Sequence, residues 1–173
     1  MGHCLSLNRE SNRNDKSPKG NNDLSDLNPK NVPSFPWLDK EVIVFIYSVY
    51  DGDTVKVLLN YNNNLFKFSI RILGIDCPEV SRCSSSEKEA GIIVRDYLRK
   101  RLERTSAKFY ATGWDKYGGR ILGHIYFLNG ESVSENLIEK GYAKPYSGKT
   151  AKEPWTEDEL WKIKNSEKIK MKY

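Results

Sequence analysis

Four acidic residues in two short stretches of the chain could bind a metal ion. Asp51 and Asp53 flank Gly52 in "YDGD", and Asp76 and Glu79 end the apolar run "RILGIDCPEV". Several oxygen atoms that converge on one point are what a hard cation such as Ca²⁺ requires. Asp-Gly pairs are also common in tight turns, so the first stretch alone does not predict a metal site.

Two arginines add a second kind of group to these acids. Arg71 lies within an apolar run, where an unpaired charge is costly, so its guanidinium needs a protein carboxylate or a substrate phosphate. Arg120 opens another apolar run after two glycines, which allow a close approach of the backbone. A lone arginine of this kind usually forms a structural ion pair. Two of them beside a metal site favour phosphoryl chemistry, in which a carboxylate acts on water and the arginines stabilise developing charge.

The hydrophobic pattern predicts the elements that must position these groups. Alternating apolar residues bounded by turn residues predict five strands, at 41–50, 53–59, 65–75, 107–114 and 120–128. Helical periodicity predicts three helices, at 86–104, 132–141 and from 156 onward, each opened by Ser or Thr with Glu three residues later. This order favours a small, mainly β, antiparallel barrel that carries helices. In a meander of the first three strands, the four acids would meet at one rim.

The composition indicates one folded domain with polar tails. Residues 1–36 are too polar to bury a core and predict a disordered tail, residues 37–166 form the predicted domain, and residues 167–173 are a basic tail. Phe35 and Trp37 are expected to dock on the edge of the domain. Three cysteines are too few for a disulfide scaffold, although a bridge between Cys77 and Cys83 stays open. No apolar run approaches the roughly 18 residues of a membrane span.

The net charge of the chain indicates which kind of molecule the protein could bind. The 173 residues carry a formal net charge of +5 with a sequence pI near 9.0. An excess of this size favours a polyanion, such as nucleic acid or an anionic membrane, but it also arises from lysines that only confer solubility.

Four motifs, in order, resemble the staphylococcal-nuclease-like (thermonuclease) family. They are "DGDTV" (51–55), "RILGIDCPE" (71–79), "DKYGGR" (115–120) and "ENLIEKGYAK" (135–144), and the resemblance covers roughly residues 41–166. It implies an OB-fold-like five-stranded barrel with three helices and a Ca²⁺-dependent, sugar-nonspecific nuclease. The implied substrates are single- and double-stranded DNA and RNA, and the implied state is a monomer.

The resemblance also implies metal-site residues. Asp53 and Asp76 resemble the carboxylate ligands of Ca²⁺, and the backbone carbonyl of Cys77 resembles a third ligand. Glu79 resembles the general base or water-orienting acid. Cys77 stands where the best-known member of the family has threonine, a change that a backbone ligand tolerates.

Four further positions resemble groups that bind the substrate. Arg71 and Arg120 resemble the two phosphate-binding arginines, and Lys116 and Tyr117 resemble residues near the nucleotide. "DKYGGR" has one glycine more than the family's "DKYGR", so Arg120 requires a shift of one residue. Two other functions stay open, a non-catalytic nucleic-acid-binding module and a membrane-tethered adaptor. Retention of the acids and arginines favours the nuclease over the first of these.

The first six residues, "MGHCLS", fit a lipidation pattern. Gly2 fits the site of N-myristoylation and Cys4 is placed for palmitoylation. Two lipids give stable anchoring where one gives marginal binding. The pattern predicts a location on the cytoplasmic face of a membrane, and without lipids a cytoplasmic one.

Overall fold

The computed structural model describes residues 28, 30 and 35–166. The chain divides into two units, Met1–Val32 and Pro33–Tyr173. The described helices and strands all belong to the second unit. The expected tail at 167–173, like most of the tail expected at 1–36, lies outside the described residues.

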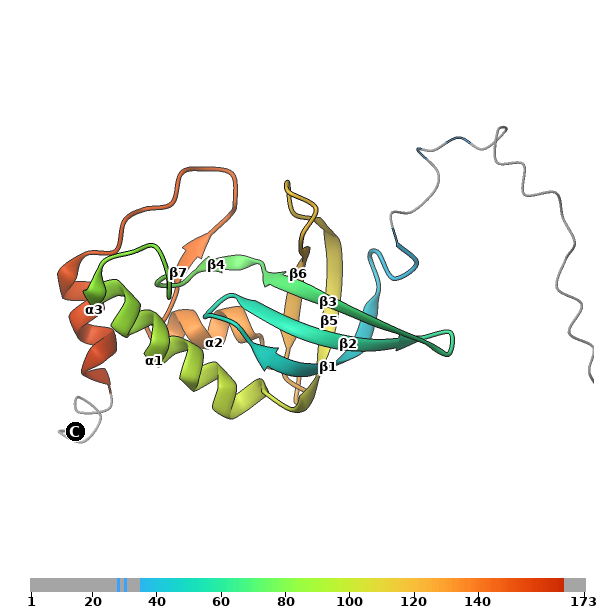
Figure 1. The fold of residues 1–173 in the computed structure, drawn as a ribbon, viewed down its shortest axis with the longest axis horizontal. Helices are drawn as coiled ribbons and strands as arrows, with labels where there is room; N and C mark the ends of the chain where they lie inside the picture. Colours follow the sequence, from blue (N-terminus) through green and yellow to red (C-terminus); the bar gives the residue numbers. More distant parts are fainter. Residues whose placement is uncertain (1–27, 29, 31–34, 167–173) are drawn as a thin grey trace, which may run out of the picture. The chain divides into compact units, whose positions relative to one another are not determined.

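Five strands close into a barrel in the order β1-β2-β3-β6-β5 (Figure 1). They are β1 (Glu41–Val49), β2 (Thr54–Tyr61), β3 (Asn64–Ile72), β5 (Thr105–Trp114) and β6 (Ile121–Tyr126). Four neighbouring pairs are antiparallel, whereas β3 and β6 are parallel. The predicted barrel is confirmed, but its description as antiparallel is wrong for this pair. Five strands cannot alternate in direction all the way round a closed ring, so one neighbouring pair has to be parallel.

A second, two-stranded sheet lies beside the barrel and was not predicted. The expected third strand breaks at Leu73, and its end forms a separate strand, β4 (Gly74–Asp76). This strand pairs with β7 (Lys144–Tyr146) in antiparallel register, which sets Asp76 opposite Lys144. The break follows from Gly74, whose positive φ of 86° turns the chain out of the barrel. The two strands therefore bring one of the predicted metal ligands next to the segment that follows β7.

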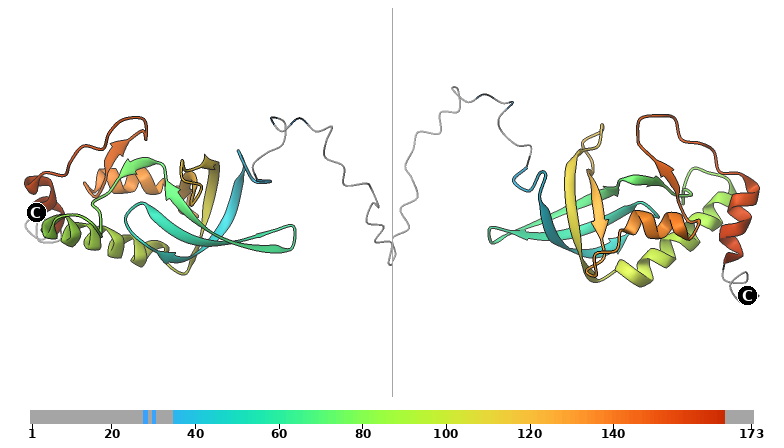
Figure 2. Two further views of the ribbon diagram at one scale, coloured as in Figure 1. Left: turned by 45° about the horizontal axis from the view of Figure 1, so that its top comes forward. Right: turned by 180° about the vertical axis from the view of Figure 1, so that it is seen from behind.

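The structure has three helices, as predicted (Figures 1 and 2). They are α1 (Ser85–Leu102), α2 (Val133–Glu139) and α3 (Glu157–Lys164), and the last two are capped by Ser132 and Thr156 as expected. Helices α1 and α2 pack on the strands, whereas α3 packs against α1. The predicted cap of α1 is wrong by two residues. Its N-cap is Ser84, which accepts from the backbone of Glu87, because Ser86 already lies in the first turn. None of the described helices is long and apolar enough to cross a membrane.

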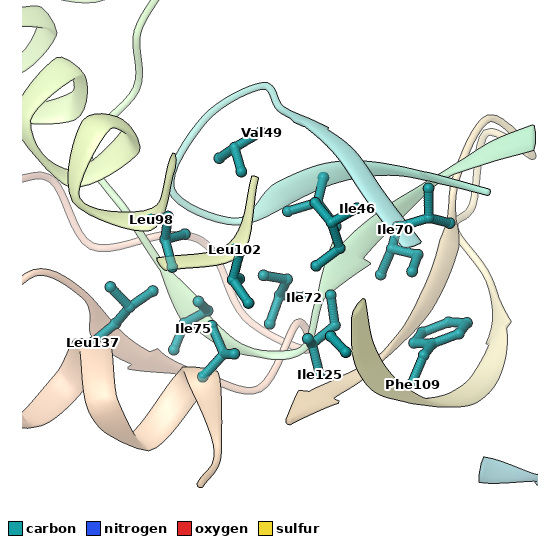
Figure 3. Packing of buried hydrophobic residues seen from close by; sticks show 14 of the residues in the cluster. Ile46, Val49, Ile70, Ile72, Ile75, Leu98, Leu102, Phe109, Ile125 and Leu137 are labelled. Carbon is teal, nitrogen blue, oxygen red and sulfur yellow. The ribbon is translucent and has the colours of Figure 1, made fainter. Parts of the chain in front are cut away.

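One continuous core joins the barrel interior to the helices. Figure 3 shows it running from Phe109 within the barrel, past Ile70 and Ile72, to Leu98 of α1 and Leu137 of α2. These five side chains are fully buried. Both helices therefore pack on the same core as the strands.

The segment before β1 packs on the barrel through its aromatic side chains, which confirms the expected docking of Phe35 and Trp37. The ring of Trp37 stacks on Phe68 with the centroids 5.8 Å apart. The ring of Phe35 meets Trp114 edge-on at 5.6 Å. Both Phe35 and Trp37 are buried, so the ordered part of the chain extends at least two residues before the predicted domain boundary.

Candidate active site

Two acid-bearing segments meet at Gly52, the central residue of the turn between β1 and β2. A Cβ atom at this position would lie 2.6 Å from Cβ and 2.8 Å from Sγ of Cys77. Only a glycine permits this approach. The contact brings the turn that carries Asp51 and Asp53 against the segment that carries Asp76. The convergence of these acids at one end of the barrel, predicted from the sequence, is therefore present in the structure.

Asp53 is buried at the centre of the site. Its carboxylate pairs with Nη1 of Arg71 and accepts a hydrogen bond of 3.0 Å from Oγ1 of Thr54. Its backbone N–H donates to Oδ1 of Asp51 at 3.0 Å. Burial raises the pKa of Asp53 above its ordinary value, the charge of Arg71 opposes this rise, and the charge of Asp51 adds to it. A positive charge placed next to Asp53 would therefore stabilise its ionised carboxylate.

Arg71 holds two parts of the site together. It alternates in β3 with the buried residues Ile70 and Ile72, so its side chain points out of the barrel interior. One guanidinium nitrogen pairs with Asp53, while Nη2 lies 4.0 Å from Oδ1 of Asp76 and donates to the carbonyl of Ile75 at 3.3 Å. The prediction that this arginine requires an anion is confirmed, and in this structure the anions are protein carboxylates.

Arg120 reaches the same site in spite of the additional glycine. Its Nη1 donates to Oγ1 of Thr54 at 3.2 Å, and its Nε pairs with Oδ2 of Asp115 at 3.0 Å. The backbone N–H of Gly119 donates to the other carboxylate oxygen of Asp115 at 2.9 Å. The extra residue is taken up within the turn, and Thr54 links the second arginine to Asp53.

The other two predicted substrate-binding residues lie in the turn between β5 and β6. Tyr117 is largely exposed, and Nζ of Lys116 lies 4.8 Å from the centre of its ring. Within residues 35–166, no hydrogen bond or ion pair joins either side chain to the four acids. Both belong to the same turn as Arg120, and the predicted contact of these two residues with a nucleotide stays a prediction.

Glu79 is positioned by helix α1. Its backbone N–H donates to Oε1 of Glu87 at 3.0 Å, and its carbonyl accepts from the thiol of Cys83 at 3.2 Å. Gly91 lets the helix come very close, since a Cβ there would lie 2.6 Å from the carbonyl oxygen of Glu79. Glu87 is a positioning residue that the sequence analysis missed, because an acid in the first turn of a helix is read as a helix stabiliser.

Lys152 is the second residue that the sequence analysis missed. Its Nζ lies 2.6 Å from Oδ1 of Asp76 and 2.8 Å from Oε1 of Glu79. Partial burial lowers the pKa of Lys152, but the bonds to the two acids outweigh this and raise it above its ordinary value. Apart from this contact with the ammonium, the buried Oδ1 of Asp76 has no hydrogen-bond partner among the described atoms. A single lysine in a loop gives no signal in the sequence.

The residues present fit a small, hard cation. Asp53 and Asp76 are buried carboxylates that share one guanidinium, and Asp76 has an oxygen without a hydrogen bond. Among the described residues no group of three or more His, Cys, Asp or Glu side chains is arranged to hold a metal, so backbone oxygen or water would have to complete the set. Burial raises the pKa of the Cys77 thiol, which favours its protonated form. A hard cation also prefers oxygen to sulfur, so the backbone carbonyl is the candidate ligand at this residue.

The two cysteines of the site are free thiols, which answers the question of a bridge between Cys77 and Cys83. The predicted lipidation sites, Gly2 and Cys4, lie outside the described residues.

The protein is a closed five-stranded barrel with three helices, and acids and arginines gather at one end of the barrel. The family model described as "Staphylococcal nuclease homologue" matches residues 69–172, and the chain belongs to this family. The match includes Arg71, Asp76, Glu79 and Arg120, whereas Asp53 lies before it.

One curated relative adds a more particular likeness. The chain is 28% identical over 116 residues to "Endonuclease Htp3" of Saprolegnia parasitica. The aligned part is 58% of this chain and 54% of the relative, so the chain spans about half the length of the curated relative that it matches.

Proposed function

We propose that the protein is a Ca²⁺-dependent, sugar-nonspecific nuclease that hydrolyses phosphodiester bonds in DNA and RNA. One observation carries the proposal, the meeting of Arg71 and Arg120 around Asp53 through an ion pair and a shared threonine. Two guanidinium groups beside buried carboxylates match the charge of a phosphodiester and of a divalent cation. Membership in the nuclease family and the likeness to a relative named an endonuclease support a nuclease-like function.

Asp53, Asp76 and the carbonyl of Cys77 would hold the cation. Ca²⁺ prefers oxygen ligands of this kind and accepts waters in its remaining positions. When bound, the ion would polarise the phosphate and neutralise charge that develops on it.

The remaining chemistry belongs to side chains of this chain. Glu79 would take a proton from the attacking water as the new P–O bond forms. Arg71 and Arg120 would donate hydrogen bonds to the phosphate oxygens while the ester P–O bond breaks and the leaving oxygen takes a proton from solvent water. Lys116 and Tyr117 would contact the nucleotide by charge and stacking, which are contacts that tolerate any base sequence.

Digestion of four substrates tests the proposal. Single- and double-stranded DNA and RNA are incubated with the full chain in Ca²⁺, and in parallel with a chelator. Glu79→Gln is the matched control, because it keeps the shape of the side chain but removes the base. Its activity is expected to fall by about 10²–10⁴-fold, while nucleic-acid binding persists. Binding without cleavage by the wild type in Ca²⁺ would favour the non-catalytic module instead.

A second proposal concerns location and rests on the residue types at positions 2 and 4. We propose a lipid tether through Gly2 and Cys4 that holds the protein on the cytoplasmic face of a membrane. One myristoyl chain binds membranes with K of only about 10⁴ M⁻¹, so the second lipid decides stable attachment. In cell fractionation, Gly2→Ala should be fully soluble and Cys4→Ser should bind weakly and reversibly. A wild type that is already soluble would remove the support for a tether.

A further inference from the structure

The segment between β7 and α3 crosses the candidate active site and brings a lysine to it. Lys152 comes from a part of the chain 73 residues away from Glu79, and its ammonium bridges Glu79 and Asp76. Asp76 is a predicted cation ligand and Glu79 the predicted base. One side chain therefore occupies the two groups on which the proposed reaction depends.

The position of Lys152 is fixed by contacts on both sides of it. The hydroxyl of Tyr146 donates to the carbonyl of Thr150 at 2.9 Å, and Nζ of Lys144 donates to the carbonyl of Pro154 at 3.1 Å. Both donors belong to β7, the strand that pairs with β4 and so with Asp76 itself. The sheet that carries the metal ligand thus also holds the loop that carries the lysine.

An ammonium and a divalent cation cannot both occupy this place. Ca²⁺ binds carboxylate oxygens at about 2.3–2.6 Å, and Nζ of Lys152 already lies 2.6 Å from Oδ1 of Asp76. Two positive charges at that separation repel strongly where the carboxylate is nearly inaccessible to water. A cavity of about 320 Å³ lies beside Asp76 and is lined by residues of the same loop, among them Thr150 and Ala151. This cavity offers space for the lysine side chain when a cation displaces it.

We propose that Lys152 is an internal cation that occupies the Asp76–Glu79 pair until a divalent ion displaces it. The contact holds the protein inactive at low cation concentration, and its strength sets the concentration at which the site fills. The inference rests on the proposed function, because it assigns regulation to the same site. A surface ion pair would contribute little, but Asp76 is only 6% exposed and the bridge joins three charged groups.

The experiment compares two lysines of one loop. Lys152→Met removes the ammonium from the acids, whereas Lys149→Met removes the same charge from an exposed position three residues away. Ca²⁺ affinity is measured by calorimetry on the full chains without nucleic acid. Lys152→Met is expected to bind Ca²⁺ about tenfold more tightly than the wild type, the factor that a charged hydrogen bond typically represents. Lys149→Met should stay within about twofold, because an exposed charge is screened.

A second measurement follows the lysine itself. The reaction of each amine with an acylating reagent is read by mass spectrometry, with and without Ca²⁺. Lys152 should react slowly in the cation-free protein and several-fold faster with Ca²⁺, while the rate at Lys149 does not change. This readout requires neither a variant that folds nor an active enzyme.

The outcomes separate the inference from the proposed function. If the wild type binds Ca²⁺ and cleaves nucleic acid but Lys152→Met binds the ion no more tightly than Lys149→Met, the internal cation is refuted and the nuclease stands. If Ca²⁺ binds as expected and displaces the lysine but no substrate is cleaved, the nuclease fails and the internal cation stands. Absence of Ca²⁺ binding in all three proteins refutes both.

Discussion

Replacing Arg71 should destabilise the protein far more than replacing Arg120, although both are proposed to bind phosphate. The side chain of Arg71 is 15% exposed and pairs with carboxylates that are 4% and 6% exposed, those of Asp53 and Asp76. The side chain of Arg120 is 35% exposed and its partner, Asp115, is 10% exposed, so this pair is less buried than that of Arg71. The two substitutions to methionine keep most of the apolar stem and remove only the charge and its hydrogen bonds.

The magnitudes follow from burial. Removing one partner of a buried ion pair costs about 3–5 kcal/mol, because it leaves an uncompensated charge in the interior. A fully exposed pair contributes about 0–1 kcal/mol, and the partly buried Arg120–Asp115 pair should lie between this value and that of the buried pair. Domains unfold with about 5–15 kcal/mol, so Arg71→Met should lose a large share of the total free energy of unfolding. The melting temperature should fall by roughly 10–20 °C for Arg71→Met and by a few degrees for Arg120→Met.

Urea unfolding in the presence of a chelator, followed by tryptophan fluorescence, measures both free energies. A third protein, Arg71→Met with Asp53→Asn, removes the stranded charge and should recover part of the loss. If Arg71→Met unfolds within about 1 kcal/mol of the wild type, Arg71 does not compensate buried carboxylates and the site is more hydrated than its geometry indicates. Equal losses from both single variants would contradict the separation of a structural from a functional arginine.

Two further substitutions test the packing that positions the site. Gly91→Ala would place a methyl group against the carbonyl of Glu79, which should cost about 1–3 kcal/mol of stability and reduce cleavage. Gly119→Ala is the control, because its methyl group enters open space and should change stability little. Thermal unfolding of both variants measures the difference. Trp37→Ala should lower the free energy of unfolding by about 3–5 kcal/mol. Trp37→Phe should lower it much less, because it keeps an aromatic ring on Phe68 and the indole N–H has no hydrogen-bond partner among the described residues. Equal losses from the two variants would argue against aromatic packing as the cause.

Rules that use only residues close together in the sequence predicted most of the helices and strands. They also predicted that the charged Arg71 needs a partner. Ser132 and Thr156 were correctly read as helix caps, because each is followed by an apolar face and an acid at the third position. The pairing of Arg71 was predicted because a charge within an apolar strand has few alternatives. For α1 the same capping rule chose Ser86 and not Ser84, since three serines in a row leave the start of the helix ambiguous and only packing decides it.

The parts that were missed depend on contacts between distant segments. The strands β4 and β7 have three residues each, and one contains Pro145, so neither shows a strand pattern by itself. They exist because each completes the hydrogen bonds of the other. The position of Lys152 depends on this pairing, because the segment that carries the lysine is held across the site by residues of β7.

The proposed cation site would give the positive side chains around it two different roles. In the structure, the charges of Asp53, Asp76 and Glu79 are met by Arg71 and Lys152. A divalent cation on the two aspartates would take over that role and release both positive side chains toward the opening of the site. A phosphate would then find Arg71 less committed to protein carboxylates than it is in the cation-free protein. Because coupling between two ligands is reciprocal, a nucleic acid that binds Arg71 should in turn strengthen binding of the ion. If the proposed function holds, the arrangement of Asp53, Asp76 and Arg71 would link metal and substrate binding through charge alone, without requiring the barrel to change shape.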